Sequence, residues 1–149
     1  MERNKQYTIR ARAIIMHEGA LLVVKHRADT PYAVLPGGHL EWGEDPRTCV
    51  IREITEELGI VPDIGRLLFV HTFLNNDTTQ TVEFHFEVLN GVAYAHPHGS
   101  EGSHVHEIAE VLWTAPHDTL PLRPDTIRTT LDDGTILADT VRFITDTAV

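Results

Sequence analysis

The stretch from Gly38 to Ile60, GHLEWGEDPRTCVIREITEELGI, constrains this chain more than any other segment. It places Glu44, Arg52, Glu53, Glu56 and Glu57 at fixed spacings between two turn glycines. Like charges held close together repel and raise each other's pKa, so a fold keeps them together most readily around a divalent cation. The segment therefore points to metal-assisted chemistry on an anionic substrate.

Turn chemistry around these carboxylates predicts a helix from Pro46 to about Leu58. Asp45 is a favoured N-cap residue, and proline is favoured at the first helical position because its missing N–H is not needed there. Gly59 is well placed to adopt the left-handed conformation that follows many helices. Upstream, the turn at residues 36–38, Pro-Gly-Gly, lets the backbone pass close to a ligand.

The predicted helix has two faces. Its core stripe recurs at i, i+4 and i+8, on Val50, Ile54 and Leu58. Glu53, Glu56 and Glu57 are spaced to share another face, where like charges at i, i+4 cost a bare helix roughly 0.2–0.5 kcal/mol per pair. A solvated acidic face is the common explanation for two or three such glutamates. The full pattern of glycines, glutamates and arginine at fixed offsets is improbable by chance.

The segment resembles the Nudix box of the Nudix hydrolase superfamily, G-x5-E-x7-R-E-U-x-E-E-x-G-U, in which U is aliphatic. Every fixed position is met, by Gly38, Glu44, Arg52, Glu53, Ile54, Glu56, Glu57, Gly59 and Ile60. The sequence of residues 35–44, LPGGHLEWGE, is most similar to MutT-type members that hydrolyse nucleotides. The rest of the chain resembles the family only in the order of its strands and helices.

The resemblance implies a pyrophosphohydrolase that cleaves a nucleoside diphosphate linked to another group, with Mg²⁺ or Mn²⁺ as cofactor. The implied metal ligands are Glu53, Glu56, Glu57 and the backbone carbonyl of Gly37 or Gly38. Glu56 and Glu57 are the principal ligands on this basis, and Glu53 is either a further ligand or the base that deprotonates water. Arg52 is expected to orient the glutamates by ion pairing, and Glu44 to support them.

Other candidate site residues lie outside the core of the motif. Many family members add a carboxylate from a later loop, and the candidates here are Glu101, Glu107 and Glu110, of which we favour Glu107. His39 and Arg27 are candidate phosphate contacts. The four histidines between residues 96 and 106 indicate a polar loop, with a pH-sensitive or phosphate-binding loop as the alternative.

Three aromatic residues are candidates to stack on a nucleobase, namely Tyr32, Trp42 and Phe73. Core packing explains Tyr32 and Phe73 equally well. Lys25 and Arg12 are basic residues on neighbouring predicted strands. Like Arg27, both are candidate phosphate contacts, and for all three a surface salt bridge is the simpler expectation.

Length and charge limit the remaining function classes. A chain of 149 residues is expected to form one domain, over residues 1–149. A net charge of −10 argues against nucleic-acid polymers and anionic membranes as partners, and a bound cation would reconcile this charge with a phosphate substrate. The single cysteine, Cys49, excludes an internal disulfide. No apolar signal segment or membrane span is found, so a cytoplasmic location is the default expectation.

Alternating and apolar segments predict strands over residues 7–16, 20–25, 32–35, 66–74, 79–89 and 107–113. In the segment 79–89, one apolar face is predicted, formed by Val82, Phe84, Phe86 and Val88. A second helix is expected from Leu122 to about Leu131, and the last fifteen residues could add an edge strand. The fold class is α/β, with a mixed sheet covered by helices. An α/β/α sandwich with a loop–helix catalytic motif is what the Nudix resemblance implies.

The substrate stays open at this stage. Secondary marks typical of ADP-ribose, dinucleoside polyphosphate and NADH hydrolases are absent, which favours a nucleoside triphosphate or related nucleotide derivative. An ADP-ribose or nucleotide-sugar hydrolase and a noncatalytic nucleotide-sensing domain are the alternatives. Homodimers are frequent in the superfamily, although no residue in this sequence proves one.

Overall fold

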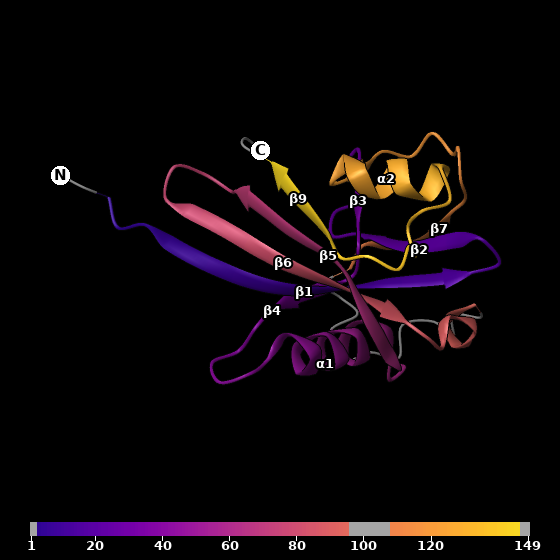
Figure 1. Cartoon of the computed structure of the whole chain (residues 1–149), viewed down its shortest axis with the longest axis horizontal. Coiled ribbons are helices and arrows are strands. Elements are labelled where there is room, and N and C mark those ends of the chain that lie inside the picture. The colour runs from indigo at the N-terminus through magenta and orange to yellow at the C-terminus, as the bar shows by residue number, and fades with distance from the viewer. Residues whose placement is uncertain (1–2, 96–107, 147–149) are drawn as a thin grey trace.

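The computed structural model describes residues 3–95 and 108–146 (Figure 1). The strands are β1 (Gln6–His17), β2 (Ala20–Lys25), β3 (Ala33–Val34), β4 (Gly37–His39), β5 (Ile64–Leu74), β6 (Thr79–Val88), β7 (Glu110–Thr114), β8 (Leu122–Arg123) and β9 (Arg142–Asp146). The helices are α1 (Pro46–Leu58), α2 (Asp125–Asp132) and the short 3₁₀ helix η1 (Gly91–Tyr94). None of the described helices is long and apolar enough to span a membrane.

All the strands form one mixed sheet with the order β8-β3-β2-β1-β6-β5-β9, to which β4 adds by pairing with β1, and β7 by pairing with β2. The long strand β1 is central: it runs parallel to β6 and antiparallel to β2 and β4. At one edge, β9 runs parallel to β5, so the C-terminal segment does supply an edge strand.

Both faces of the sheet are covered, as Figure 1 shows by the positions of α1 and α2 on opposite sides. Alternation along β1 divides its side chains between two cores. Ala11, Ala13 and Ile15 pack in the cluster that contains the buried residues of α1, whereas Ile14 packs with those of α2. A strand in a sheet that is buried on both faces has apolar residues in succession, as β2 (ALLVVK) does. The predicted α/β/α architecture is confirmed.

Local signals set the bounds of α1 where the sequence predicted them. The Asp45 side chain accepts a hydrogen bond from the Thr48 N–H at 2.9 Å, which caps the first turn. Gly59 follows the helix in the left-handed conformation at φ 78°. Val50 and Ile54 are fully buried, so the apolar stripe anchors the helix and leaves the glutamate face to be positioned by it.

Strand β6 differs from its prediction in which face is buried. Phe86 and Val88 do join the α1 core, and Phe84 packs against it. The opposite, polar face is buried as well, through Thr81, Glu83 and His85. The expectation of a single apolar buried face was incomplete, because the second layer of the sandwich covers the polar face too.

Two short strands were not predicted as such. Leu122 and Arg123 form β8, parallel to β3, instead of the start of the second helix, which begins at Asp125. Gly37–His39 forms β4 against β1. Both elements are too short to give a periodic pattern, and both matter for the site.

Candidate active site

At the two glycines of β4, the backbone passes very close to neighbouring groups of β1 and α1. Gly37 has φ +146°, and a Cβ there would lie 2.1 Å from the Ala11 carbonyl oxygen on β1. A Cβ on Gly38 would lie 2.5 Å from the Glu53 carboxyl carbon. Only glycine fits at Gly37, and at Gly38 its absent side chain lets a carboxylate rest against the main chain.

Three carboxylates of α1 gather around this glycine turn. Glu57 is 4% exposed, and its Oε2 accepts a hydrogen bond from the Gly37 N–H at 3.2 Å. Glu53 lies against Gly38, with its carboxyl group in the space that a Cβ at that position would need. Arg52 Nη1 joins the group, donating to Glu53 Oε1 at 2.9 Å and to Glu56 Oε2 at 3.3 Å. The helix face predicted from the spacing is therefore held together at one place.

Arg52 clamps the loop before α1 onto the helix. Its Nε and Nη2 each donate to one oxygen of Glu44, both at 2.8 Å, and Nη2 also donates to the His39 carbonyl oxygen at 3.1 Å. Hydrogen bonding from Arg52 lowers the pKa of Glu44 to about 2. Glu44 raises the pKa of the guanidinium in return. These contacts give Arg52 and Glu44 the orienting and supporting positions that the resemblance implies.

The donor set at the glycine turn suits a hard divalent cation. Glu53, Glu56 and Glu57 contribute only oxygen atoms, and the buried carboxylate of Glu57 has a backbone N–H to fix its orientation. Mg²⁺ and Mn²⁺ prefer such oxygen ligands. These three side chains, with the nearby Gly38 carbonyl, are the groups that would hold the ion.

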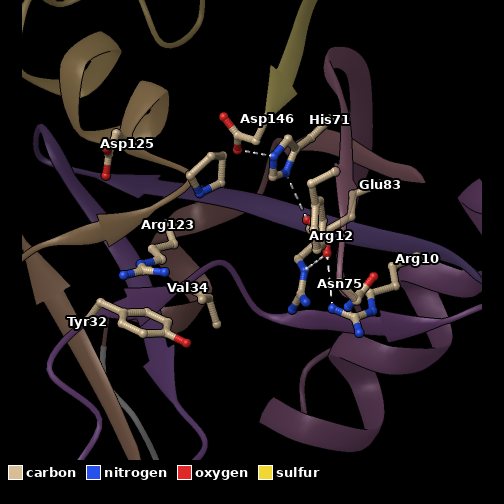
Figure 2. Close-up of a pocket in the computed structure, with 12 residues that line it drawn as sticks. Arg10, Arg12, Tyr32, Val34, His71, Asn75, Glu83, Arg123, Asp125 and Asp146 are labelled. Carbon is tan, nitrogen blue, oxygen red and sulfur yellow. Dashed lines mark hydrogen bonds and ion pairs between the residues drawn. The ribbon is translucent and has the colours of Figure 1, made fainter. Parts of the chain in front are cut away.

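A pocket of about 480 Å³ lies on the face of β1 opposite the α1 core (Figure 2). Arg10 and Arg12 line it, and they pair in register with His39 and Gly37 of β4. Arg10 Nε also donates to His39 Nε2 at 3.1 Å. Among the described strands, β4 pairs only with β1.

The pocket walls combine aromatic rings with a cation. The Arg123 guanidinium lies 4.3 Å from the centroid of the Tyr32 ring. Phe73 stacks on the His71 ring, with centroids 4.6 Å apart and planes inclined by 28°. Such flat surfaces suit a planar aromatic ligand. The Asp125 side chain at the start of α2 adds a hydrogen-bond acceptor (Figure 2).

An ion-pair network forms the pocket floor. Arg12 Nε donates to Glu83 Oε2 at 2.9 Å, and its Nη1 donates to the Leu35 carbonyl oxygen at 2.9 Å. Burial opposes ionisation of Glu83, but the charge of Arg12 and the adjacent rings of His71 and His85 outweigh it and hold the pKa of Glu83 below its ordinary value. Arg12 is only 8% exposed, so the expectation of a surface salt bridge was wrong for this residue.

The remaining predicted residues are scattered. Arg27 is outside the pocket lining. Its side chain is 79% exposed, and its Nε lies 3.3 Å from Asp29 Oδ1. Trp42 is fully exposed in the loop before α1. Glu110 opens β7, opposite Lys25 of β2. Glu101, Glu107 and the histidines of residues 96–106 lie outside the described residues.

Several pocket residues had no counterpart among the predicted site residues, namely Arg10, His71, Asn75, Glu83, Arg123 and Asp125. A signal was present for Glu83. The segment TQTVEFHFEV alternates, and its polar positions place Thr81, Glu83 and His85 on one face. An acidic and a basic group on a strand whose other face is core indicate a second buried surface.

Comparisons with known proteins agree with this fold. A family model described as the NUDIX domain matches residues 6–133. The ADP-ribose pyrophosphatase of Methanocaldococcus jannaschii is 33% identical over 84 residues, which cover 52% of this chain and 49% of that protein. The CTP pyrophosphohydrolase of Escherichia coli is 29% identical over 118 residues, which cover 75% of this chain and 80% of that protein.

Among solved structures, the MutT NUDIX hydrolase of Burkholderia pseudomallei superposes with a TM-score of 0.67 and 26% identity, covering 86% of this chain and 98% of that one. The sheet with two covering helices is thus shared with a solved NUDIX hydrolase. The chain belongs to the NUDIX domain family, as the box predicted. It spans about half the length of the ADP-ribose pyrophosphatase that it matches.

Proposed function

We propose that this protein is a divalent-metal-dependent pyrophosphohydrolase that cleaves a nucleoside diphosphate linked to another group. One observation carries the proposal. Glu53 and Glu57 of α1 lie against a glycine turn, Arg52 links Glu53 to Glu56, and the strand β1 that pairs with this turn lines an aromatic, arginine-rich pocket. The activities named for the two relatives, on ADP-ribose and CTP, are of this chemical class.

On this proposal, residues of the pocket would bind the nucleotide, and residues at the glycine turn would bind the metal ion. In the pocket, Tyr32 and Phe73 would hold the base, because their rings offer flat apolar surface. Arg10 and His39, which meet at the edge of β4, would contact the phosphate chain as it passes toward the carboxylates. This path assigns to His39 the phosphate contact predicted from the sequence.

At the glycine turn, Glu53, Glu56 and Glu57 would hold Mg²⁺ or Mn²⁺. The bound ion supplies charge neutralisation for the diphosphate and lowers the pKa of water. Arg52 keeps Glu53 and Glu56 oriented through its 2.9 Å and 3.3 Å contacts. Glu53 is either a ligand or the group that accepts the proton of the attacking water, and both roles require its carboxylate beside Gly38.

A nucleoside triphosphate or a related nucleotide derivative is the favoured substrate. The pocket supports this choice because about 480 Å³ accommodates a nucleoside, and its polar lining offers hydrogen-bond partners to a base. A panel of nucleoside triphosphates, ADP-ribose and nucleotide sugars with Mg²⁺ or Mn²⁺, followed by identification of the products, decides among the substrate classes.

Removing one carboxylate tests the mechanism. Glu57→Gln keeps the shape of the side chain but removes its charge, and turnover is expected to fall at least about 100-fold with the fold intact. Glu18→Gln is the matched control, because Glu18 lies in the β1–β2 turn with its side chain 85% exposed. Unchanged turnover in folded Glu57→Gln protein would refute the proposed metal site. Tight nucleotide binding without hydrolysis across the panel would favour a sensing domain.

A further inference from the structure

A second group of metal-ligand side chains lies away from the Nudix box, at the floor of the pocket. His71 on β5 and Glu83 and His85 on β6 are 5%, 4% and 0% exposed. One ligand atom from each lies within 4.8 Å of the other two. Figure 2 shows His71 and Glu83 facing each other across the pocket floor. The chemistry proposed for the carboxylates of α1 uses none of these three side chains.

The spacing of their atoms suits a metal ion better than direct hydrogen bonds. Glu83 Oε1 is 3.3 Å from His85 Nε2 and 3.5 Å from His71 Nδ1. Both distances exceed the range of about 2.7–3.2 Å that is usual for N–H···O bonds. Ligands at about 2.1 Å from a tetrahedral zinc ion lie about 3.4 Å from one another.

The orientation of His71 leaves a lone pair directed at this point. His71 Nε2 is 2.7 Å from Asp146 Oδ2, where an N–H donates to the carboxylate. The other ring nitrogen, Nδ1, is buried without a hydrogen-bond partner, and in the neutral form of the ring it carries the lone pair. A histidine that donates to a carboxylate through one nitrogen and ligates through the other is the usual arrangement at zinc sites.

The charges of the three groups also match what a metal requires. The network with Arg12 keeps Glu83 ionised, and it occupies only Oε2, so Oε1 is directed at the two rings. Burial lowers the pKa of His85, and the adjacent Glu83 carboxylate acts in the opposite direction. Metal ions bind ionised carboxylates and neutral imidazoles. A lone pair beside a carboxylate oxygen in a dry site is unfavourable unless a proton or a cation lies between them.

We propose that His71 Nδ1, Glu83 Oε1 and His85 Nε2 bind one transition-metal ion of the zinc class, with Asp146 orienting His71. Two imidazoles and one carboxylate select zinc, cobalt or nickel over magnesium. Two of the three side chains that would hold the ion, His71 and Glu83, also line the pocket. The site is therefore distinct from the hard-cation site of α1, and its occupancy requires no nucleotide.

Cobalt is the probe, because a tetrahedral nitrogen–oxygen site gives Co²⁺ intense visible absorption, whereas an octahedral oxygen site gives weak absorption. The experiment uses the full chain after removal of metals, with saturating Mg²⁺ to fill the Nudix box. The histidines at 96, 98, 104 and 106 are replaced by glutamine in every sample, because imidazoles on that segment also bind cobalt. Zn²⁺ affinity is measured by competition with bound Co²⁺.

We expect one equivalent of Co²⁺ with intense absorption, displaced by Zn²⁺. His71→Gln and His85→Gln should each weaken binding by more than about 100-fold, and Asp146→Asn by about 10-fold. His17→Gln is the matched control and should change nothing, because His17 lies at the end of β1, outside the pocket lining.

Weak octahedral absorption, or intense absorption that survives both ligand substitutions, would overturn the proposal. The first result would mean that a proton alone links Glu83 to the two rings. A measurement on protein that keeps His71 and His85 tests the site even if the ligand variants fail to fold. In the nitrogen-15 NMR spectrum, Zn²⁺ should shift His71 Nδ1 and His85 Nε2, and unshifted signals would refute the site directly.

Discussion

The glycine turn gives a prediction whose magnitude follows from its geometry. In Gly38→Ala, the new Cβ would lie 2.5 Å from the Glu53 carboxyl carbon, and ordinary contact begins at 3.4 Å. The obstacle is the end of a flexible side chain, so the fold should survive while the carboxylate moves by about 0.9 Å. A misplacement of about 1 Å at a reacting centre costs roughly 100-fold in rate.

Gly37→Ala should behave in the opposite way. Its Cβ would lie 2.1 Å from a backbone oxygen of β1, and φ is +146°, so neither the side chain nor the strand can adapt cheaply. We expect a loss of at least about 3 kcal/mol in unfolding free energy. Gly134→Ala is the control, because its φ is +78° and nothing lies within 4 Å of its Cβ. It should cost about 1 kcal/mol in stability and leave turnover unchanged.

The assay combines urea unfolding with kcat/KM on the substrate that the panel identifies, and with Mn²⁺ affinity in the absence of nucleotide. Gly38→Ala should keep nearly full stability while both its turnover and its Mn²⁺ affinity fall. Wild-type turnover in this variant would refute the placement of Glu53 as a functional group. Greater loss of stability in Gly38→Ala than in Gly37→Ala would refute the backbone argument.

Three further predictions use other parts of the structure. Because Arg52 depresses the pKa of Glu44 from 4.5 to about 2, this pair stabilises the fold above pH about 4.5 and loses its effect as the pH falls toward 2. Glu44→Gln should therefore flatten the acid limb of a plot of unfolding free energy against pH, and an unchanged limb would contradict this. Ile54→Ala should cost about 2–5 kcal/mol in urea unfolding, because Ile54 is fully buried beneath the acidic face; a loss below about 1 kcal/mol would show that it is not a core residue. Tyr32→Ala should raise KM roughly 10-fold with little change in kcat if its ring stacks on the base, whereas equal KM values would remove Tyr32 from the binding surface.

Features encoded by neighbouring residues were predictable from the sequence. The bounds of α1 follow from Asp45, Pro46 and Gly59, all within or next to the helix. The turn at Glu18 and Gly19, both with positive φ, likewise joins β1 to β2. Each of these signals depends on the conformation of a few adjacent residues.

The pocket depends on contacts between distant segments. Arg12 and Glu83 are 71 positions apart, and His71 and Asp146 are 75 apart. These pairs meet because β1, β6, β5 and β9 adopt one register, and a shift by one residue would turn every side chain to the other face. No local pattern specifies that register. The polar face of β6 indicated a second buried surface, but not what lies against it.

The division of the site between one contiguous segment and several separate ones affects how the protein could be altered. The carboxylates all belong to α1, whereas the pocket walls come from the segment before β3, from β5 and from β8. Combinatorial libraries at Tyr32, Phe73 and Arg123 would vary ligand preference without touching any glutamate of the helix. On the proposed function, the scaffold is thus modular for protein engineering, because the pocket can be redesigned while the carboxylates of α1 stay constant.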